Sequence, residues 1–94
     1  MEIIQENGTT EGVFLATEDG RVIGEMTYVW SGNEYFIINH TEVSDEYKGQ
    51  GVGKKMVEKA IEFARENNYT IYPQCSFAQD VFDRNPAYND VIKN

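Results

Sequence analysis

The sequence predicts an α+β domain built from a mixed, mainly antiparallel sheet of about five strands together with two helices. In the first half of the chain, short apolar segments alternate with turns that contain Gly, Asn or Asp, as in antiparallel strands. After Ser44 the apolar residues recur with the period of a helix. The 94 residues are 40% hydrophobic, which is enough for one core, and we therefore assign residues 1–94 to a single domain.

The first four strands are predicted at residues 3–6, 12–17, 21–30 and 34–43. Short turns separate them, and Asp19-Gly20 between the second and third strands is a typical hairpin signal. The fourth strand carries polar residues near its end. Strict alternation would place one set of side chains on one face, Phe36, Ile38, His40 and Glu42, and the other set on the opposite face, Tyr35, Ile37, Asn39, Thr41 and Val43.

An amphipathic helix is predicted at about residues 51–67, because apolar residues recur there at helical spacing and charged residues occupy the other face. The apolar positions are Val52, Met56, Val57, Ala60, Ile61, Phe63 and Ala64. A short strand at residues 70–74 follows, and then a second helix at residues 76–85 with Ser76 as its N-cap. The conformation of residues 88–92 is left without an assignment.

The order strand, helix, strand makes the fourth and fifth strands parallel, with a right-handed crossover. Pro73 lies inside the fifth strand and has no N–H to donate to a neighbouring strand. We therefore expect the fourth and fifth strands to separate at Pro73.

Acidic residues outnumber basic residues by 16 to 8, which gives a net charge of −8. This charge argues against nucleic acid as a partner and favours cationic partners such as amines. Cys75 is the only cysteine, the first residues lack the pattern of a signal peptide, and no apolar run approaches transmembrane length. We expect a cytoplasmic protein without a membrane partner, and a domain this small is compatible with a homodimer.

The segment Lys48-Gly49-Gln50-Gly51-Val52-Gly53 lies between the fourth strand and the long helix. A helix N-terminus favours an anion, and glycines let the backbone approach a ligand closely. The segment is therefore a candidate phosphate cradle, and a glycine-rich turn without a ligand is the alternative. It does not match the P-loop, because Lys55 stands where Ser or Thr is required, and its glycine spacing differs from the dinucleotide-binding fingerprint.

Strand, glycine segment and amphipathic helix together resemble the acetyl-coenzyme A motif of the GCN5-related N-acetyltransferases. Gly51 and Gly53 match the two small positions of that motif, whereas Lys48 stands where the family has Gln or Arg. Over residues 34–92 the chain also resembles the small single-domain YjdJ-type members. The segments that carry this second similarity are His40-Thr41-Glu42-Val43, Cys75-Ser76-Phe77-Ala78 and Pro86-x-Tyr88-x-Asp90-Val91.

The resemblance implies a minimal form of that family's fold, with acetyl-coenzyme A or coenzyme A as cofactor and no metal. Backbone N–H groups of residues 50–54 would hold the pyrophosphate, and the pantetheine arm would lie between the fourth and fifth strands. Lys54, Lys55 and Arg84 would neutralise phosphate charge or else be solvated surface residues. The implied cofactor-binding set is Val43, Lys48, Gly49, Gln50, Gly51, Val52, Gly53, Lys54, Lys55 and Cys75.

Transfer of an acetyl group to an amine needs a base for the amine and an acid for the leaving thiolate. His40 and Glu42 are candidate bases if their face of the strand lines the cleft; the alternatives are a histidine that positions the strand and a surface carboxylate. Cys75 precedes a helix N-terminus, and the resemblance places it near the thioester. It could carry the acetyl group, donate to the leaving sulfur, or be a small buried residue.

The predicted function is therefore an N-acetyltransferase that uses acetyl-coenzyme A to acetylate an amine of a protein or peptide. The acceptor site is expected to be open, because only Thr9-Thr10-Glu11 stands where the resemblance implies helices that close over the acceptor. The alternative is a coenzyme A or acyl-coenzyme A binding module with little or no turnover, acting as a sensor or a partner-dependent subunit. An interaction domain that has kept only the fold is the third reading.

Overall fold

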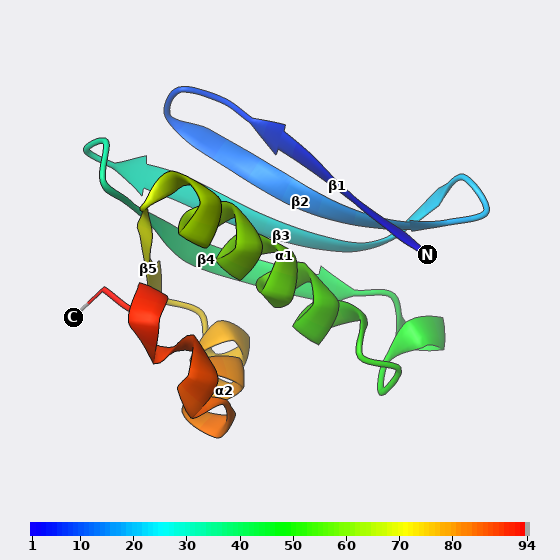
Figure 1. Cartoon of the computed structure of the whole chain (residues 1–94). Coiled ribbons are helices and arrows are strands. Elements are labelled where there is room, and N and C mark those ends of the chain that lie inside the picture. The colour runs from blue at the N-terminus through cyan, green and yellow to red at the C-terminus, as the bar shows by residue number, and fades with distance from the viewer. Residues whose placement is uncertain (94) are drawn as a thin grey trace.

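Five strands form one sheet in the order β1-β2-β3-β4-β5 in the computed structural model (Figure 1), which describes residues 1–93. The strands are β1 (Glu2–Asn7), β2 (Glu11–Glu18), β3 (Arg21–Ser31), β4 (Tyr35–Val43) and β5 (Thr70–Pro73). Neighbouring strands are antiparallel except for β4 and β5, which are parallel. The predicted α+β class and the mixed, mainly antiparallel sheet are confirmed.

Helix α1 (Val52–Asn67) lies across one face of the sheet, and α2 (Ser76–Arg84) follows β5 (Figure 1). Two short 3₁₀ helices, η1 (Asp45–Tyr47) and η2 (Pro86–Val91), precede α1 and follow α2. The buried side chains of the strands and helices form one apolar cluster, whose burial is the main stabilising contribution; its largest members are Tyr28, Phe14, Phe36 and Met26. No helix among the described residues combines the length and the apolar character needed to cross a membrane.

Both α-helices form close to their predicted ends, but the cap of α2 differs from the prediction. The backbone of Cys75 is extended, with a ψ of 147°, and its Sγ accepts the N–H of Ala78 at 3.4 Å. Cys75 is therefore the N-cap. Ser76 is already the first residue of the helix, so its predicted capping role was wrong.

The C-terminal segment, unassigned from the sequence, packs back on α1 and β5. Arg65 of α1 donates two hydrogen bonds to the carboxylate of Asp90, at 2.8 and 2.9 Å, and a third to the carbonyl of Ala87. The N–H of Lys93 donates to the carbonyl of Ile71 at 2.8 Å. The end of the chain thus supports the outer edge of β5.

A β-bulge interrupts β4 near its middle. Tyr28 of β3 pairs with Ile38, and the residue before it in β3, Thr27, pairs with His40. Asn39 is therefore an extra residue of β4 with no partner on β3. An extra residue of this kind bends the strand and increases its local twist.

The bulge reverses the faces of all later residues of β4. Before it, Phe36 and Ile38 are buried, and after it Thr41 and Val43 are the partly buried residues. The prediction from strict alternation was wrong beyond Ile38, because one inserted residue moves each following side chain to the other face. The side chains that become exposed instead are those of His40 and Glu42.

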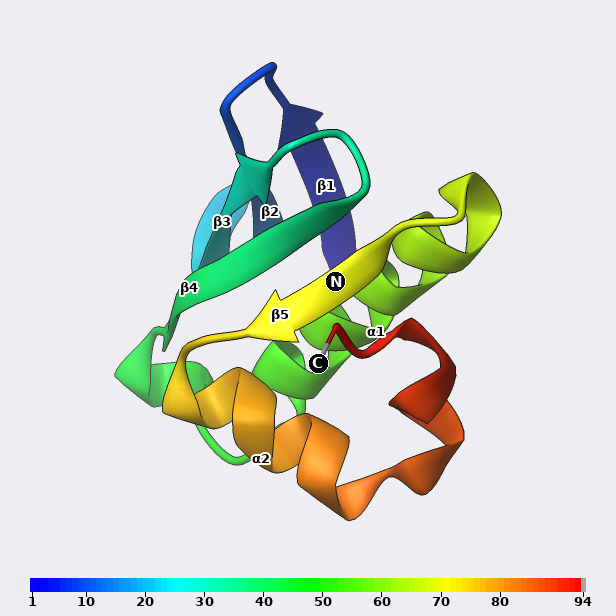
Figure 2. The ribbon, with the colours of Figure 1, turned by 90° about the vertical axis from the view of Figure 1, so that its left-hand side faces the viewer.

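Strand β5 pairs only with the first part of β4. The ladder ends where Ile38 lies opposite Pro73, and the carbonyl of Ile38 then accepts the N–H groups of Gln74 and Cys75, at 3.0 and 3.1 Å. Beyond this point the chain turns into α2, and residues 39–43 run on without a strand on that side (Figure 2). The predicted separation of the two strands at Pro73 is confirmed.

Candidate functional site

Residues 48–53, called the glycine turn from here on, present backbone N–H groups at the start of α1. Gly49 and Gly51 have φ values of 81° and 80°, and a Cβ on either would meet nothing within 4 Å. The N–H of Lys55 donates to the carbonyl of Gly51 at 3.0 Å. In the described chain the N–H groups of residues 51–54 have no backbone acceptor, and no acidic residue occupies the first turn of α1. This end of the helix therefore suits an anion.

Local hydrogen bonds fix the shape of the glycine turn. The N–H of Gln50 donates to the carbonyl of Tyr47 at 3.3 Å, and Lys48 Nζ lies 2.9 Å from Asp45 Oδ1. Of the predicted backbone donors, that of Gln50 is thus already engaged. The other predicted donors, the N–H groups of residues 51–54, have no backbone acceptor in the described chain.

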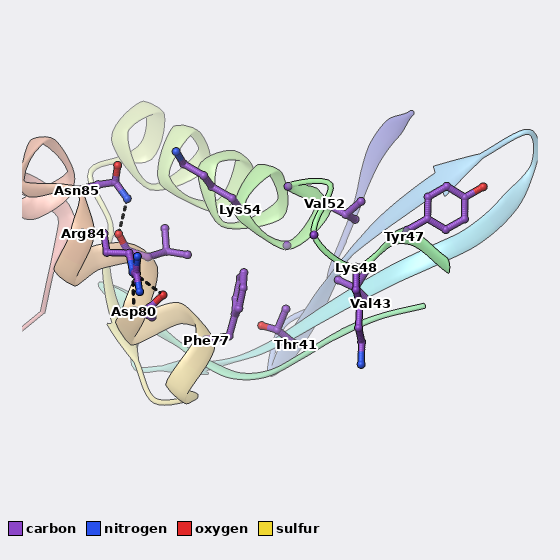
Figure 3. Close-up of a pocket in the computed structure, with 14 residues that line it drawn as sticks. Thr41, Val43, Tyr47, Lys48, Val52, Lys54, Phe77, Asp80, Arg84 and Asn85 are labelled. Carbon is purple, nitrogen blue, oxygen red and sulfur yellow. Dashed lines mark hydrogen bonds and ion pairs between the residues drawn. The ribbon is translucent and has the colours of Figure 1, made fainter. Parts of the chain in front are cut away.

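A cavity of about 740 Å³ opens between the glycine turn, β4 and α2 (Figure 3). Thr41 and Val43 line it from β4, and Phe77 lines it from α2. The N–H of Ser44 donates to the carbonyl of Ile23 on the β3 side. Because alternate residues turn their peptide groups to opposite edges of a strand, those of Thr41 and Val43 point to the edge that β5 has left.

The structure separates the cationic residues that were predicted to meet phosphate. Lys54 lines the cavity and has no ion pair within residues 1–93. Lys55 lines a different hollow beside β1. Arg84 lines the cavity, but its Nε is 3.0 Å from the carboxylate of Asp80, and this hydrogen bond raises the pKa of Arg84 above its ordinary value. Lys54 is thus the cavity cation without a carboxylate partner.

Cys75 lies where β4 and β5 separate. Its N–H is bound to Ile38, and its Sγ, which accepts the N–H of Ala78, is also 3.4 Å from Thr41 Oγ1. The thiol is half-buried. Thr41 lines the cavity at the part of β4 that is farther from the glycine turn. The sulfur of Cys75 contacts Thr41 and therefore lies next to that end of the cavity.

His40 and Glu42 lie close to each other but face away from the cavity. His40 Nε2 is 3.8 Å from Glu42 Oε2, and the two side chains are 55% and 74% exposed. Glu42 also lies opposite Glu25 of β3, which places two carboxylates side by side. These two candidate bases can therefore meet a molecule that approaches the face of the sheet opposite α1, and not one that lies in the cavity.

Six cavity residues are absent from the site predicted by sequence: Thr41, Tyr47, Phe77, Asp80, Val81 and Asn85. The bulge hides Thr41, because strict alternation assigns it to the other face. A signal for the α2 residues does exist in the sequence. Phe77, Asp80 and Arg84 follow each other at spacings of three and four, which puts them on one face of a helix that starts beside Cys75.

The site fits coenzyme A on three counts. The free N–H groups of residues 51–54 match the oxygens of a pyrophosphate. The open edge of β4 offers peptide groups to the amides of an extended arm, as a sheet edge does when it binds a peptide. Lys54 supplies a positive charge at the end of the cavity where the phosphates would lie.

The sequence matches the family described as GCN5-related N-acetyl-transferase over residues 13–91. The chain therefore belongs to this family. A GCN5-like protein from Staphylococcus aureus, solved by NMR, is 39% identical, and the superposition covers 99% of this chain and 88% of that chain with a TM-score of 0.72.

Two other relatives share shorter segments. Human protein NATD1 is 30% identical over 61 residues, which are 65% of this chain and 54% of NATD1, so the chain spans about half the length of that relative. A protein from Bacillus anthracis, solved in complex with acetyl coenzyme A, is 27% identical with a TM-score of 0.59. That superposition covers 69% of this chain and 38% of the Bacillus chain.

Proposed function

We propose that this member of the GCN5-related N-acetyltransferase family binds acetyl-coenzyme A in the cavity and transfers the acetyl group to a primary amine. One observation carries the proposal: the free N–H groups of the glycine turn lead to an unpaired edge of β4, and that edge ends beside Cys75. The Bacillus anthracis relative solved with acetyl coenzyme A supports the same ligand. The bound cofactor supplies an activated acyl thioester.

The glycine turn and Lys54 hold the pyrophosphate in this proposal. The N–H groups of residues 51–54 donate to its oxygens, and the N-terminal end of the α1 dipole favours its charge. The chain has a net charge of −8, which repels an anionic ligand at long range. The ammonium of Lys54 in the cavity offsets this repulsion locally by attracting the phosphates. The peptide groups of Thr41 and Val43 pair with the amides of the pantetheine arm in place of a fifth strand.

Three side chains, those of His40, Glu42 and Cys75, handle the protons. The amine arrives from the face of the sheet opposite α1, where His40 and Glu42, 3.8 Å apart, take up its proton directly or through water. Cys75 lies at the separation of β4 and β5 and gives its proton to the leaving thiolate. Thr41 and Ala78 fix the position of its sulfur. Transient acetylation of Cys75 is the other assignment for this thiol.

Charge and shape favour a cationic acceptor that belongs to a larger molecule. Glu25 and Glu42 lie side by side on the exposed face of the sheet, and the whole chain carries a net charge of −8. Only residues 8–10 connect β1 to β2, so this connection contains no helix that could cover that face. An uncovered face of this kind fits a lysine side chain or an N-terminus of a protein, because small ligands bind in enclosing pockets.

The same openness favours a second candidate function. Acyl transfer benefits when the reacting groups are closed off from water, whereas the side chains of His40 and Glu42 are 55% and 74% exposed. A coenzyme A or acyl-coenzyme A binding module with little turnover, completed by a partner subunit, would need no such closure.

Thermal unfolding with and without acetyl-coenzyme A tests the binding step. Ligand at about 100 times its Kd adds about 2.7 kcal/mol, which raises the Tm of a domain this small by roughly 10–20 °C. We expect this shift with coenzyme A and acetyl-coenzyme A, and none with NAD. Gly51→Val should abolish the shift, because a branched side chain blocks the cradle and opposes the φ of 80°. An undiminished shift in this variant would exclude the glycine turn as the binding site.

Turnover separates the two candidate functions. Acetyl transfer to a panel of amines, peptides and proteins is expected for the enzyme, and binding without transfer indicates the module. Intact-mass analysis after incubation with acetyl-coenzyme A tests the thiol: an adduct that is present in the wild type and absent in Cys75→Ala assigns Cys75 as an acetyl carrier.

A further inference from the structure

The ring of Phe77 rests on the bare backbone of Gly53 in the first turn of α1. A Cβ on Gly53 would lie 2.5 Å from Cζ and 2.8 Å from Cε2 of that ring. Gly53 is buried and helical without a positive φ. Its backbone conformation therefore does not require glycine, and the contact with Phe77 does. The small residue at position 53 is explained by packing within the chain.

The backbone that carries the ring is held in place. Cys75 is tied to Ile38 through its N–H and to Ala78 through its Sγ, and Ala78 is fully buried. The ring cannot retreat toward α1, because Gly53 leaves no space behind it. Phe77 lines the cavity, and the residue as a whole is 40% exposed.

Phe77 follows Cys75 by two residues, and its ring reaches Gly53 at the start of α1. In Figure 3 its ring projects from the start of α2 toward α1, beside Thr41. Thr41 is the residue whose hydroxyl lies 3.4 Å from the Cys75 sulfur, and Thr41 and Phe77 both line the cavity. An acyl group that runs along the open edge of β4 to reach Cys75 therefore meets the ring.

We propose that Phe77 sets the length of the acyl group that the site accepts, admitting acetyl and rejecting longer chains. This inference rests on the proposed function, since it concerns the acyl end of the same ligand. Phe77 neither exchanges protons nor forms bonds; its ring limits the space for the acyl group, and its position depends on the contact with Gly53. The absence of a side chain at Gly53 seats the ring, and the N–H of Gly53 remains one of the donors of the glycine turn.

The size of the effect follows from how apolar pockets discriminate. One methylene group more or less changes recognition by about 10–200-fold. Removal of the benzyl ring should therefore raise the affinity for butyryl-coenzyme A, relative to acetyl-coenzyme A, by about tenfold or more.

Calorimetric titration of Phe77→Ala and Phe77→Leu with coenzyme A, acetyl-coenzyme A and butyryl-coenzyme A tests the proposal. We expect butyryl-coenzyme A to gain most, relative to acetyl-coenzyme A, in Phe77→Ala, and the Kd of coenzyme A in each variant is the reference for any general change in the cavity. Tyr72→Ala is the matched control, because Tyr72 is 45% exposed and lies outside the cavity. Phe77→Leu keeps an apolar residue on Gly53 and remains informative if the alanine variant is unstable.

A rescue experiment tests the role of Gly53. In Gly53→Ala the new methyl displaces the ring into the cavity, because the ring is the movable partner, and the affinity for acetyl-coenzyme A should fall by about tenfold. The double variant Gly53→Ala/Phe77→Ala should regain it. Gly51→Ala is the control, since its φ of 80° and open surroundings involve no contact with Phe77, and Phe77→Ala should not rescue it.

The outcomes separate this inference from the proposed function. A wild type that fails to bind coenzyme A overturns both. A wild type that binds coenzyme A, with the same acyl preference in Phe77→Ala, overturns only the role of Phe77. Failure of the double variant to recover affinity would mean that Gly53 serves the ligand itself, and the ring-seating explanation would be wrong.

Discussion

In β4, residues 35–38 pair with a strand on each side, whereas residues 40–43 pair with β3 alone. Phe36 and Ile38 of the first half are fully buried, and Thr41 and Val43 of the second half line the cavity. Two local features cause the difference: an extra residue at Asn39 and the end of β5 at Pro73. The comparison teaches that a strand can serve the core over one half and a binding site over the other, with no break in secondary structure between them.

Truncation of a side chain in each half should show the largest contrast in stability. Phe36→Ala removes a fully buried ring from the core and should lower the free energy of unfolding by about 3–5 kcal/mol. Val43→Ala removes a half-buried side chain beside the cavity, and we expect a loss of about 1 kcal/mol. Urea unfolding of both variants measures the difference, and equal losses would contradict the division of β4 into two halves.

Deletion of Asn39 should affect binding more than stability. Because Asn39 is an extra residue, its loss lets Ile38 and His40 remain opposite Tyr28 and Thr27 in a regular ladder. The strand would straighten at the point where it leaves β5, and the affinity for acetyl-coenzyme A should fall at least about tenfold, or about 1.4 kcal/mol. Calorimetric titration and urea unfolding measure the two effects.

Asn39→Ala is the matched control for the deletion. It keeps the extra residue and loses only the exposed hydrogen bond from Thr27 Oγ1 to Asn39 Oδ1, at 2.7 Å. We expect near-normal binding of acetyl-coenzyme A and a loss of about 0.5–1.5 kcal/mol in the free energy of unfolding. Normal binding by the deletion variant would show that the bulge does not shape the site.

The fold was predictable because its signals are local. The spacing of Val52, Met56 and Ala60 identifies α1, and Pro73 marks the end of the pairing between β4 and β5. The glycine turn was predictable for the same reason, since it follows a strand and opens a helix. Its free N–H groups result from that position alone.

The parts that the sequence did not predict depend on contacts between distant segments. No Gly or Pro marks the bulge at Asn39. The period of two in the sequence continues from Ile37 to Val43 without a sign of an extra residue. The cap at Cys75 depends on the hydrogen bonds that the carbonyl of Ile38 accepts from the N–H groups of Gln74 and Cys75, just after β5. The packing of Phe77 on Gly53 depends on how α1 and α2 lie relative to each other. The roles given to His40, Glu42, Cys75 and the glycine turn stay predictions.

The smallest expected effect concerns the outer support of the first half of β4. Strand β5 pairs with that half of β4. The C-terminal segment in turn binds β5 through the hydrogen bond from the N–H of Lys93 to the carbonyl of Ile71. Arg65 holds this segment by its two hydrogen bonds to Asp90. Because this ion pair is exposed to solvent, Asp90→Asn should reduce stability by less than Val43→Ala does.

The pH dependence identifies the ion pair as the cause. The hydrogen bonds from Arg65 lower the pKa of Asp90 below its ordinary value. The stabilisation is therefore complete above the ordinary pKa of an aspartic acid and is lost as the pH falls through the lowered pKa of the folded protein. Urea unfolding should show wild type more stable than Asp90→Asn at neutral pH, with the two converging in strong acid.

Asp83→Asn removes the same formal charge from a residue that has no ion pair within residues 1–93, and it should leave the neutral-pH stability nearly unchanged. A difference between wild type and Asp90→Asn that persists unchanged into strong acid would assign the effect to packing of the C-terminal segment. The support of β5 would then rest on the backbone contact with Ile71, because that contact carries no titrating group.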